Sequence, residues 1–160
     1  MTILLVSNLY SLVNNLTVHY LALLATFYYN SVNDEMRFDM AKLSEDTKRI
    51  ISEVHLAQVA TASKDGRPNV SPRGSFRVLD DEHVIFTDGG RLYTLANLRE
   101  NPQVSAVVYD VATRQGCRIW GTAEILESGG LFDIISTEAA SRGRTVQHLV
   151  KVTVEEIVTF

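Results

Sequence analysis

From residue 56 onward, short apolar and β-branched stretches alternate with tight-turn residues, and this spacing constrains the fold more than any other feature. Residues 56–63 form the first stretch, and Lys64-Asp65-Gly66-Arg67 follows it, where the Asp-Gly pair favours a tight hairpin. A second stretch at 69–79 ends at Asp80-Asp81-Glu82, and a third covers 83–87. Three strands in immediate succession, joined by tight turns, predict an antiparallel meander.

Helices are predicted at three places along the chain. Ser44 is a good helix N-cap with acidic residues directly after it, so a helix is predicted over 45–54. The remaining pattern predicts helices over 91–99 and 128–141 and strands over 104–110, 117–126 and 149–160. Strands in mainly antiparallel order, with short helices between them, argue against a doubly wound α/β sheet. They predict a mainly β protein, a small six-stranded barrel with helices outside it.

Residues 1–39 do not match the rest of the chain. Residues 1–29 are apolar and aromatic and contain no Lys or Arg, whereas a secretory signal opens with a basic region. The densest apolar run, 16–29, is shorter than the roughly 20 residues that a membrane-spanning helix needs. Two interpretations stay open: the segment is an added amphipathic helix that packs on the domain or on a partner subunit, or it is not part of the native domain. We favour the second, with a start at Met36 or Met40, and take 40–160 as the folded domain.

Composition limits the classes of function. A chain of 160 residues with 46% hydrophobic and 21% charged residues suits one ordinary globular domain. Its net charge of -4 gives no electrostatic footprint for nucleic acid or for an anionic membrane. The one cysteine, Cys117, cannot form an internal disulfide, which favours a reducing, cytoplasmic location, and its apolar surroundings predict a core or barrel-wall position. The four histidines are not paired with other ligand types at metal spacing, so no metal site is predicted.

Seven short segments, taken together and in order, resemble the FMN-binding split barrels related to pyridoxamine-phosphate oxidase. Each segment alone is weak evidence, and their order along 40–160 carries the resemblance, more for the fold than for a reaction. The segments are His55-Leu56-Ala57-Gln58-Val59-Ala60-Thr61, Asp65-Gly66-Arg67-Pro68, Val70-Ser71-Pro72, Thr87-Asp88-Gly89-Gly90, Thr94-Leu95-Ala96-Asn97-Leu98, Asn101-Pro102 and Arg118-Ile119-Trp120-Gly121-Thr122-Ala123.

The resemblance implies an antiparallel split β-barrel of six strands with short flanking helices. It implies a homodimer with FMN at the subunit interface, and an FMN phosphate near the second strand and the start of the helix after the third. The residues that it points to for cofactor binding are Ser71, Pro72, Arg73, Thr87, Asp88, Arg91, Tyr93 and Thr94.

A phosphate cradle is also chemically reasonable at the start of the predicted second helix. Gly89-Gly90 lets the backbone approach a ligand, and a helix N-terminus presents unpaired N–H groups. Arg91 adds a charge-assisted fork, Thr94 a hydroxyl, and Arg73 a second cation. Taken alone, the glycine pair is more often only a strand-to-helix turn. Many relatives carry a Lys shortly before the threonine, where this chain has Tyr93, and we expect Arg91 to supply that charge.

Other residues have narrower expected roles. Ser71 is expected to bond the phosphate or the ribityl chain, and Pro72 predicts an edge or an irregularity in its strand. Thr87 and Asp88 are expected near the flavin ring or the ribityl hydroxyls. For Trp120, a barrel-core position is favoured over stacking near the flavin or across the dimer. Two arginines, Arg114 and Arg118, either border an anionic substrate or are surface charges.

The leading functional expectation is an FMN-dependent oxidoreductase that acts on a small molecule or redox partner, because the flavin itself carries the chemistry in such enzymes. One alternative is a non-catalytic flavin carrier for electron transfer. Another keeps the barrel and changes the ligand to the deazaflavin F420 or to haem, for which His55, His83 and His148 would be the available axial ligands. The fold alone cannot choose among these chemistries, and the pattern identifies neither a catalytic residue nor a substrate.

Overall fold

The computed structural model describes residues 41–89 and 92–160, all of which belong to one compact unit, 39–160. Arg91 and Gly90 of the predicted phosphate cradle lie outside the described residues. In chain order the elements are α2 (Glu45–Val54), β1 (Ala57–Ala62), β2 (Pro68–Arg73), β3 (Arg77–Val78), β4 (His83–Asp88), α3 (Leu92–Glu100), β5 (Gln103–Tyr109), β6 (Gly116–Leu126), α4 (Gly130–Ser141) and β7 (His148–Thr159). The predicted helix over 45–54 is confirmed at both ends.

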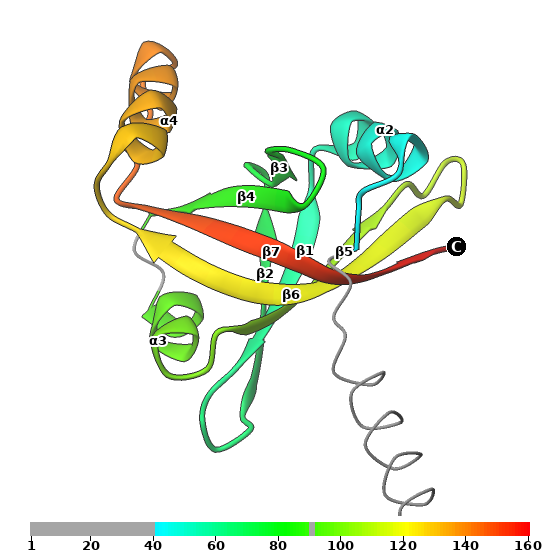
Figure 1. The fold of residues 1–160 in the computed structure, drawn as a ribbon, viewed down its shortest axis with the longest axis horizontal. Coiled ribbons are helices and arrows are strands. Elements are labelled where there is room, and N and C mark those ends of the chain that lie inside the picture. The colour runs from blue at the N-terminus through cyan, green and yellow to red at the C-terminus, as the bar shows by residue number, and fades with distance from the viewer. Residues whose placement is uncertain (1–40, 90–91) are drawn as a thin grey trace, which may run out of the picture. The chain divides into compact units, whose positions relative to one another are not determined.

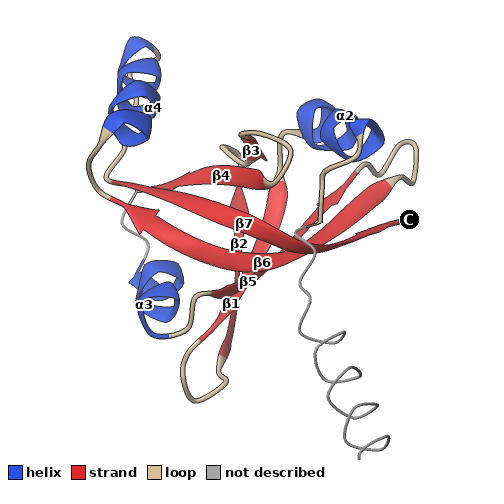
Figure 2. Cartoon of the chain, viewed as in Figure 1, coloured by secondary structure: helices blue, strands red, loops and turns tan. Residues whose placement is uncertain are grey.

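One curled antiparallel sheet organises these elements, in the order β2-β1-β5-β6-β7-β4-β3. Figure 1 shows the sheet bending round so that β1 and β2 lie behind β6 and β7. The helices lie outside it, with α2 and α4 at opposite ends of β4 (Figure 2). The predicted class, a mainly β antiparallel split barrel with short flanking helices, is confirmed.

The predicted strand over 69–79 is two strands, so the sheet has seven strands where six were predicted. The chain turns at Gly74-Ser75, between β2 and β3, and the Phe76 N–H donates to the Arg73 carbonyl at 3.4 Å. Both predicted antiparallel pairings across tight turns are present, β1 with β2 and β3 with β4, but β2 and β3 lie at opposite edges of the sheet, so the three strands do not form one continuous meander. The expectation from Pro72 is confirmed, since β2 is an edge strand and its proline needs no ladder partner.

The core consists of alternate residues of the strands, on the concave side of the sheet. In β6, Cys117 and Ile119 are almost fully buried, which confirms the wall position predicted for the cysteine. Trp120 is next to Ile119 and therefore faces the other way, half-buried on the outer face, so its predicted core position is wrong. The guanidinium carbon of Arg118 lies 5.5 Å from the centre of the Trp120 ring.

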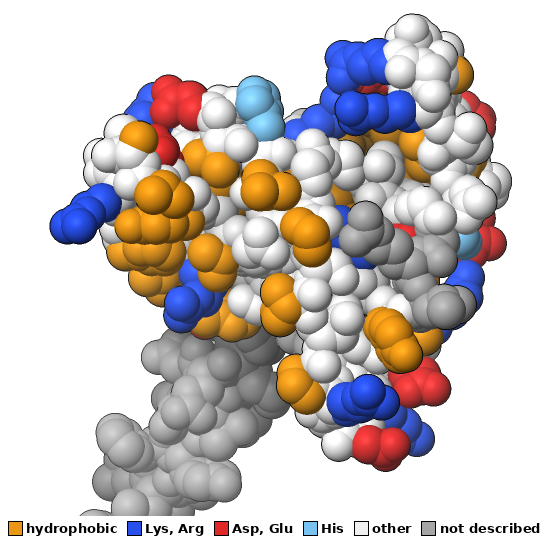
Figure 3. Space-filling model, turned by 180° about the vertical axis from the view of Figure 1, so that it is seen from behind, with side chains coloured by type: hydrophobic (Ala, Val, Ile, Leu, Met, Phe, Trp, Pro, Cys, Tyr) orange, Lys and Arg blue, Asp and Glu red, His pale blue; other side chains and the backbone are white. Residues whose placement is uncertain are grey.

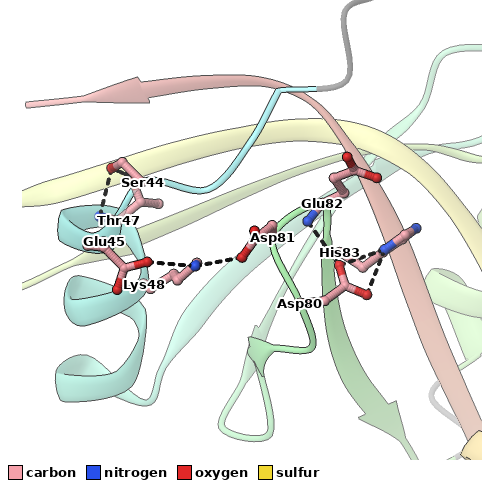
Figure 4. Close-up of polar contacts among 8 residues, drawn as sticks. All are labelled: Ser44, Glu45, Thr47, Lys48, Asp80, Asp81, Glu82 and His83. Carbon is pink, nitrogen blue, oxygen red and sulfur yellow. Dashed lines mark hydrogen bonds and ion pairs between the residues drawn. The ribbon is translucent and has the colours of Figure 1, made fainter.

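Helix α2 is fixed to the barrel at its first turn (Figure 4). Ser44 caps it, because the Thr47 N–H donates to the Ser44 hydroxyl at 3.2 Å. Lys48 then bridges Glu45 on the same helix and Asp81 in the turn before β4, both at 2.7 Å. In that turn, the Nδ1 atom of His83 lies 2.8 Å from an Asp80 carboxylate oxygen.

Candidate functional site

A buried polar cluster joins the edge strand β2 to the first turn of α3. Strand β2 alternates, so Asn69, Ser71 and Arg73 turn inward while Val70 and Pro72 face outward. Arg73 is 4% exposed and Thr94, from α3, is 1% exposed. The Arg73 guanidinium donates to the Thr94 hydroxyl at 2.7 Å, and the Thr94 hydroxyl lies 3.4 Å from that of Ser71. Three of the predicted cofactor-binding residues, from two elements, therefore meet here.

The hydrogen-bond donors of this cluster converge on hydroxyl oxygens. Thr94 accepts from Arg73 and from the Asn69 amide at 3.3 Å, so its own proton is directed to Ser71. Thr61 of β1 accepts from Asn69 at 3.3 Å and from Asn97 at 3.1 Å. The half-buried Ser71 hydroxyl is the last acceptor of the first chain, and within residues 41–89 and 92–160 its own proton has no acceptor.

An acidic partner balances the charge of Arg73. Asp88, at the end of β4, is 1% exposed and its carboxylate lies 2.6 Å from the guanidinium. The guanidinium also lies 5.3 Å from the centre of the Phe86 ring. A buried ion pair with this many contacts fixes the Arg73 side chain in one position. Arg73 therefore contributes oriented donors to the cluster, while Asp88 compensates its charge.

The other predicted site residues take different positions. Thr87 is half-buried, and its N–H donates to the Ser75 hydroxyl at 2.9 Å, which joins β4 to the turn after β2. Tyr93 is 64% exposed, with the guanidinium carbon of Arg67 at 5.9 Å from its ring centre. Pro72 lies on the outer face, opposite the cluster.

Three members of the cluster were missed from the sequence: Thr61, Asn69 and Asn97. Asn69 could have been predicted from the sequence, because it precedes Ser71 by two residues and so lies on the same face of the strand. Asn97 was available as well, three residues after Thr94 on the predicted helix, where such spacing puts side chains on one side.

A groove of about 1020 Å³ lies on the other side of the turn at Gly74-Ser75. It runs between α2 and α4, and its walls include Ser75, which follows Arg73 by two residues, and Thr87, which precedes Asp88. In Figure 3 it opens at the upper edge of the molecule, between the two helices, and Lys and Arg side chains gather beside it on the α4 side. Arg114 and Arg118, named from the sequence as possible substrate neighbours, are not among its lining residues.

The histidines are distributed singly over the described part of the chain. His55 lines the groove, where it ends α2 in a left-handed conformation with φ of 55°. His148 lies 3.4 Å from Glu127, and His83 pairs with Asp80. Among residues 41–89 and 92–160, no group of three or more His, Cys, Asp or Glu side chains is placed to hold a metal ion.

From β2 to β6, two rows on the outer face of the sheet carry few charges. Strand pairing places Val70, Ala60, Ser105 and Trp120 in one row across β2, β1, β5 and β6. The neighbouring row is Pro72, Gln58, Val107 and Arg118. Val70 is 63% exposed, and hydrophobic side chains spread over the face seen in Figure 3. No helix in the described residues has the length and apolarity to cross a membrane.

The amino-acid sequence of this chain is similar to a known protein family and to a known protein. The family model described as pyridoxamine 5'-phosphate oxidase matches residues 43–159. An uncharacterised protein of Methanocaldococcus jannaschii is 35% identical in an alignment of 97 positions that covers 56% of this chain and 60% of that protein. The matched part of this chain thus spans less than two thirds of the relative's length.

Solved structures agree on the fold. HupZ of Group A Streptococcus is 28% identical, with a TM-score of 0.69 over 73% of this chain and 93% of that one. A pyridoxamine 5'-phosphate oxidase-like protein of Lactobacillus delbrueckii is 25% identical, with a TM-score of 0.64 over 75% and 96%. Less similar chains show the same fold alone: an FMN-binding protein of Syntrophomonas wolfei, the haem storage protein HutZ of Vibrio cholerae and an F420 reductase, which are 15%, 22% and 20% identical.

Proposed function

Because the chain belongs to the pyridoxamine 5'-phosphate oxidase family, we propose that it binds FMN and serves as a flavin-dependent oxidoreductase. The observation that carries the proposal is the donor chain from Arg73 through Thr94 to Ser71. It ends at a half-buried hydroxyl whose proton is available to an external acceptor. A phosphate oxygen is such an acceptor, and hydrogen bonds to a charged acceptor are the strong ones.

The residues of the cluster offer hydrogen-bond donors, which are the groups that a phosphate binds. Three donor groups, from Arg73, Asn69 and Asn97, already saturate the hydroxyl oxygens of Thr94 and Thr61, so the cluster has more donors than acceptors. We propose that Ser71 holds the phosphate directly and that Arg73 and Thr94 orient it. Arg91, which follows Gly90 before α3, is proposed to add the charge that Asp88 cancels at Arg73.

We propose that the flavin ring lies in the groove between α2 and α4, on the other side of the turn at Gly74-Ser75 from the cluster. Thr87 and Ser75 line the groove and are close in the chain to Asp88 and Arg73, so we propose that a ligand held by its phosphate at Ser71 reaches the groove along this turn. Bound FMN would supply hydride or electron transfer, while these residues orient the ring and exclude water.

A second copy of the chain is proposed to complete the site. The two rows on the outer face, from β2 to β6, would otherwise leave Val70 and Trp120 in water. Only Arg118 among those eight residues carries a charge, which is typical of the centre of a subunit interface.

The first test is the absorption spectrum and ligand mass of the purified full chain. Two flavin bands and the mass of FMN are expected. A Soret band would move the assignment to haem, with His55 of the groove as its first candidate ligand, and the mass of F420 would move it to that cofactor. Reversible reduction of bound FMN without turnover of any small molecule would identify an electron carrier.

The second test is a pair of variants in the cluster. Ser71→Ala is expected to raise the Kd for FMN at least tenfold, because a hydrogen bond to a charged group contributes roughly 1.5 to 3 kcal/mol. Ser141→Ala is the matched control, since the Ser141 hydroxyl donates only to a carbonyl within α4 and Ser141 does not line the groove. Equal FMN affinity of the two variants would place the phosphate elsewhere.

A further inference from the structure

A histidine stands beside the buried ion pair of the polar cluster. Strands β4 and β7 lie side by side (Figure 1), and their ladder places His148 directly opposite Asp88. The next pair along the ladder is Thr87 with Leu149, and both of these residues line the groove. Residues directly opposite each other in an antiparallel pair share one face of the sheet, and that face alternates along the strand. His148 therefore points away from the groove, on the face where Asp88 meets Arg73.

The imidazole of His148 is mostly buried and has a partner at one nitrogen only. Its side chain is 20% exposed, and its Nε2 atom lies 3.4 Å from a carboxylate oxygen of Glu127, in the turn after β6. That carboxylate also accepts from the Arg99 guanidinium at 3.0 Å, which joins α3 to β7. The Nδ1 atom is buried without a hydrogen-bond partner in residues 41–89 and 92–160. A proton added to the ring would give both nitrogens an N–H, and only Glu127 is placed to accept one.

The charges around His148 cancel in pairs. Arg73 pairs with Asp88, and Arg99 pairs with Glu127. The charged side chains of α4 and of the residues after it are exposed or line the groove on the other face: Asp133, Glu138, Arg142 and Arg144. The state of His148 therefore decides the net charge of the five groups, which is zero with a neutral imidazole and one positive charge with a protonated one.

A charge at this position acts on an anion bound at Ser71. The hydrogen-bond chain from Ser71 leads through Thr94 to Arg73, whose charge Asp88 compensates. A proton on the imidazole opposite Asp88 would compensate that carboxylate from a second side and leave the site positively charged. Histidine is the side chain whose ordinary charge change falls between pH 5 and 8. The imidazole is therefore placed to adjust the charge of the phosphate site within that range.

We propose that His148 is a positioning residue of the phosphate site: when a phosphate binds, its imidazole takes up a proton and partly neutralises Asp88, so that Arg73 acts on the phosphate as a cation. The inference rests on the proposed function, because it needs a phosphate near Ser71. Linkage requires that the proton and the phosphate favour each other's binding by the same factor. The charge of His148 therefore raises FMN affinity as the pH falls from 8 to 5.5. The residue acts through Asp88 and Arg73 and does not touch the ligand.

Titration of the full chain with FMN from pH 5.5 to 8 tests the proposal. Wild type is compared with His148→Gln, which keeps a hydrogen-bonding group beside Glu127 and cannot gain a proton. The ratio of the two Kd values removes the titration of the phosphate itself, whose second pKa is about 6. We expect this ratio to favour wild type by about threefold to tenfold more at pH 5.5 than at pH 8, the effect of one further charge close to the site.

Two controls separate the phosphate from other effects. Riboflavin has the same ring without the phosphate, and its Kd ratio between the two proteins is expected to stay constant with pH. His83→Gln removes another histidine, 23% exposed, that pairs with a carboxylate, Asp80, at 2.8 Å, and it is expected to leave the FMN profile unchanged. Calorimetry at pH 7 in buffers of different ionisation enthalpy is expected to show more proton uptake on FMN binding in wild type than in His148→Gln.

Glu127→Gln is a second variant, at an exposed carboxylate, and it keeps His148 in place. The protonated imidazole then lacks its partner, so the rise in FMN affinity is expected to begin at a lower pH than in wild type. This variant decides the question where His148→Gln does not fold by circular dichroism. An unchanged profile in Glu127→Gln would overturn the proposal.

The ratio of Kd values also distinguishes the two ways in which the proposal can fail. If wild type binds FMN and the ratio stays constant from pH 5.5 to 8, the role of His148 is overturned and the proposed function stands. The same pH-dependent ratio with riboflavin would also overturn that role, because the effect would not concern the phosphate. If wild type binds no FMN at any pH, the proposed function and this inference are overturned together.

Discussion

The guanidinium of Arg73 donates to the hydroxyl of Thr94 at 2.7 Å and so joins an edge strand to a helix across 21 residues of sequence. The same guanidinium pairs with Asp88 at 2.6 Å. One buried side chain thus fixes β2, β4 and α3 relative to one another, which are the three elements that surround the proposed phosphate site.

Replacement of one partner of this ion pair is expected to be costly. Arg73→Met removes the cation that lies 2.6 Å from the buried Asp88 carboxylate and is expected to lower the free energy of unfolding by about 3 to 5 kcal/mol. The double variant Arg73→Met/Asp88→Leu is expected to be more stable than Arg73→Met alone, because no buried charge remains. Urea unfolding of the two single variants and the double variant measures this coupling. Additive losses would show that the pair is not energetically coupled.

Val70→Asp is expected to separate the proposed dimer into monomers. A buried carboxylate at the centre of an apolar interface is expected to weaken association by about 2 kcal/mol or more, or roughly thirtyfold in Kd. Sedimentation across a range of concentrations measures the change. Ile134→Asp on α4 is the control, since Ile134 is similarly exposed, at 66% against 63% for Val70. A wild-type chain that is monomeric at all concentrations would refute the second-copy proposal.

Acid is expected to loosen α4 from the barrel. Hydrogen bonding from Arg77 holds the pKa of Glu138 below its ordinary value of 4.5. A carboxyl whose pKa is lowered by folding contributes stability above its unfolded value, and that contribution is lost as the pH falls through the folded value. The wild type is therefore expected to exceed Glu138→Gln in stability at pH 7, and the difference is expected to shrink below about pH 4.5.

Urea unfolding at several pH values measures that difference, with Asp133→Asn on the same helix as the control. If the difference in the free energy of unfolding between wild type and Glu138→Gln stayed constant down to pH 3, an ion pair between Arg77 and Glu138 would be contradicted.

Cys117 is expected to resist alkylation in the folded protein. Burial raises the pKa of the Cys117 thiol to about 11, so roughly one thiol in a thousand is ionised at pH 8. Labelling by iodoacetamide is expected to be at least a hundredfold slower than in urea, where the ordinary pKa near 8.5 returns. Mass spectrometry of a labelling time course measures both rates, and similar rates would mean that β6 opens readily.

A chain that begins at Met40 is expected to fold and to bind FMN as the full chain does. The family match covers 43–159, and the compact unit begins at residue 39. Thermal unfolding and FMN titration of the two proteins provide the comparison. Insolubility of the shorter chain, with a soluble full chain, would show that residues 1–39 stabilise the domain.

Local signals predicted most of the elements correctly. Ser44 specified the start of α2, because a capping side chain acts within one helical turn. The Asp65-Gly66 pair specified the hairpin of β1 and β2, and Gly66 has the positive φ, 80°, that such turns use.

Long-range features could not be predicted in the same way. The two-residue alternation of Val70, Pro72, Phe76 and Val78 continues across the turn at Gly74-Ser75, so periodicity alone could not show that β2 and β3 separate to opposite edges. Trp120 looked like a core residue by type, and only the register of β6 with β5 shows that it faces outward. Asp88 looked like a turn residue or a ligand contact, since nothing local indicates that Arg73 of another strand pairs with it.

The turn at Gly74-Ser75 has a further consequence. Arg73 precedes it and belongs to the polar cluster, whereas Arg77 follows it and holds the groove wall through Glu138. A single ligand that reaches from Ser71 into the groove, as proposed for FMN, would hold the turn from both sides at once. Release of that ligand would then loosen the polar cluster and the groove wall together.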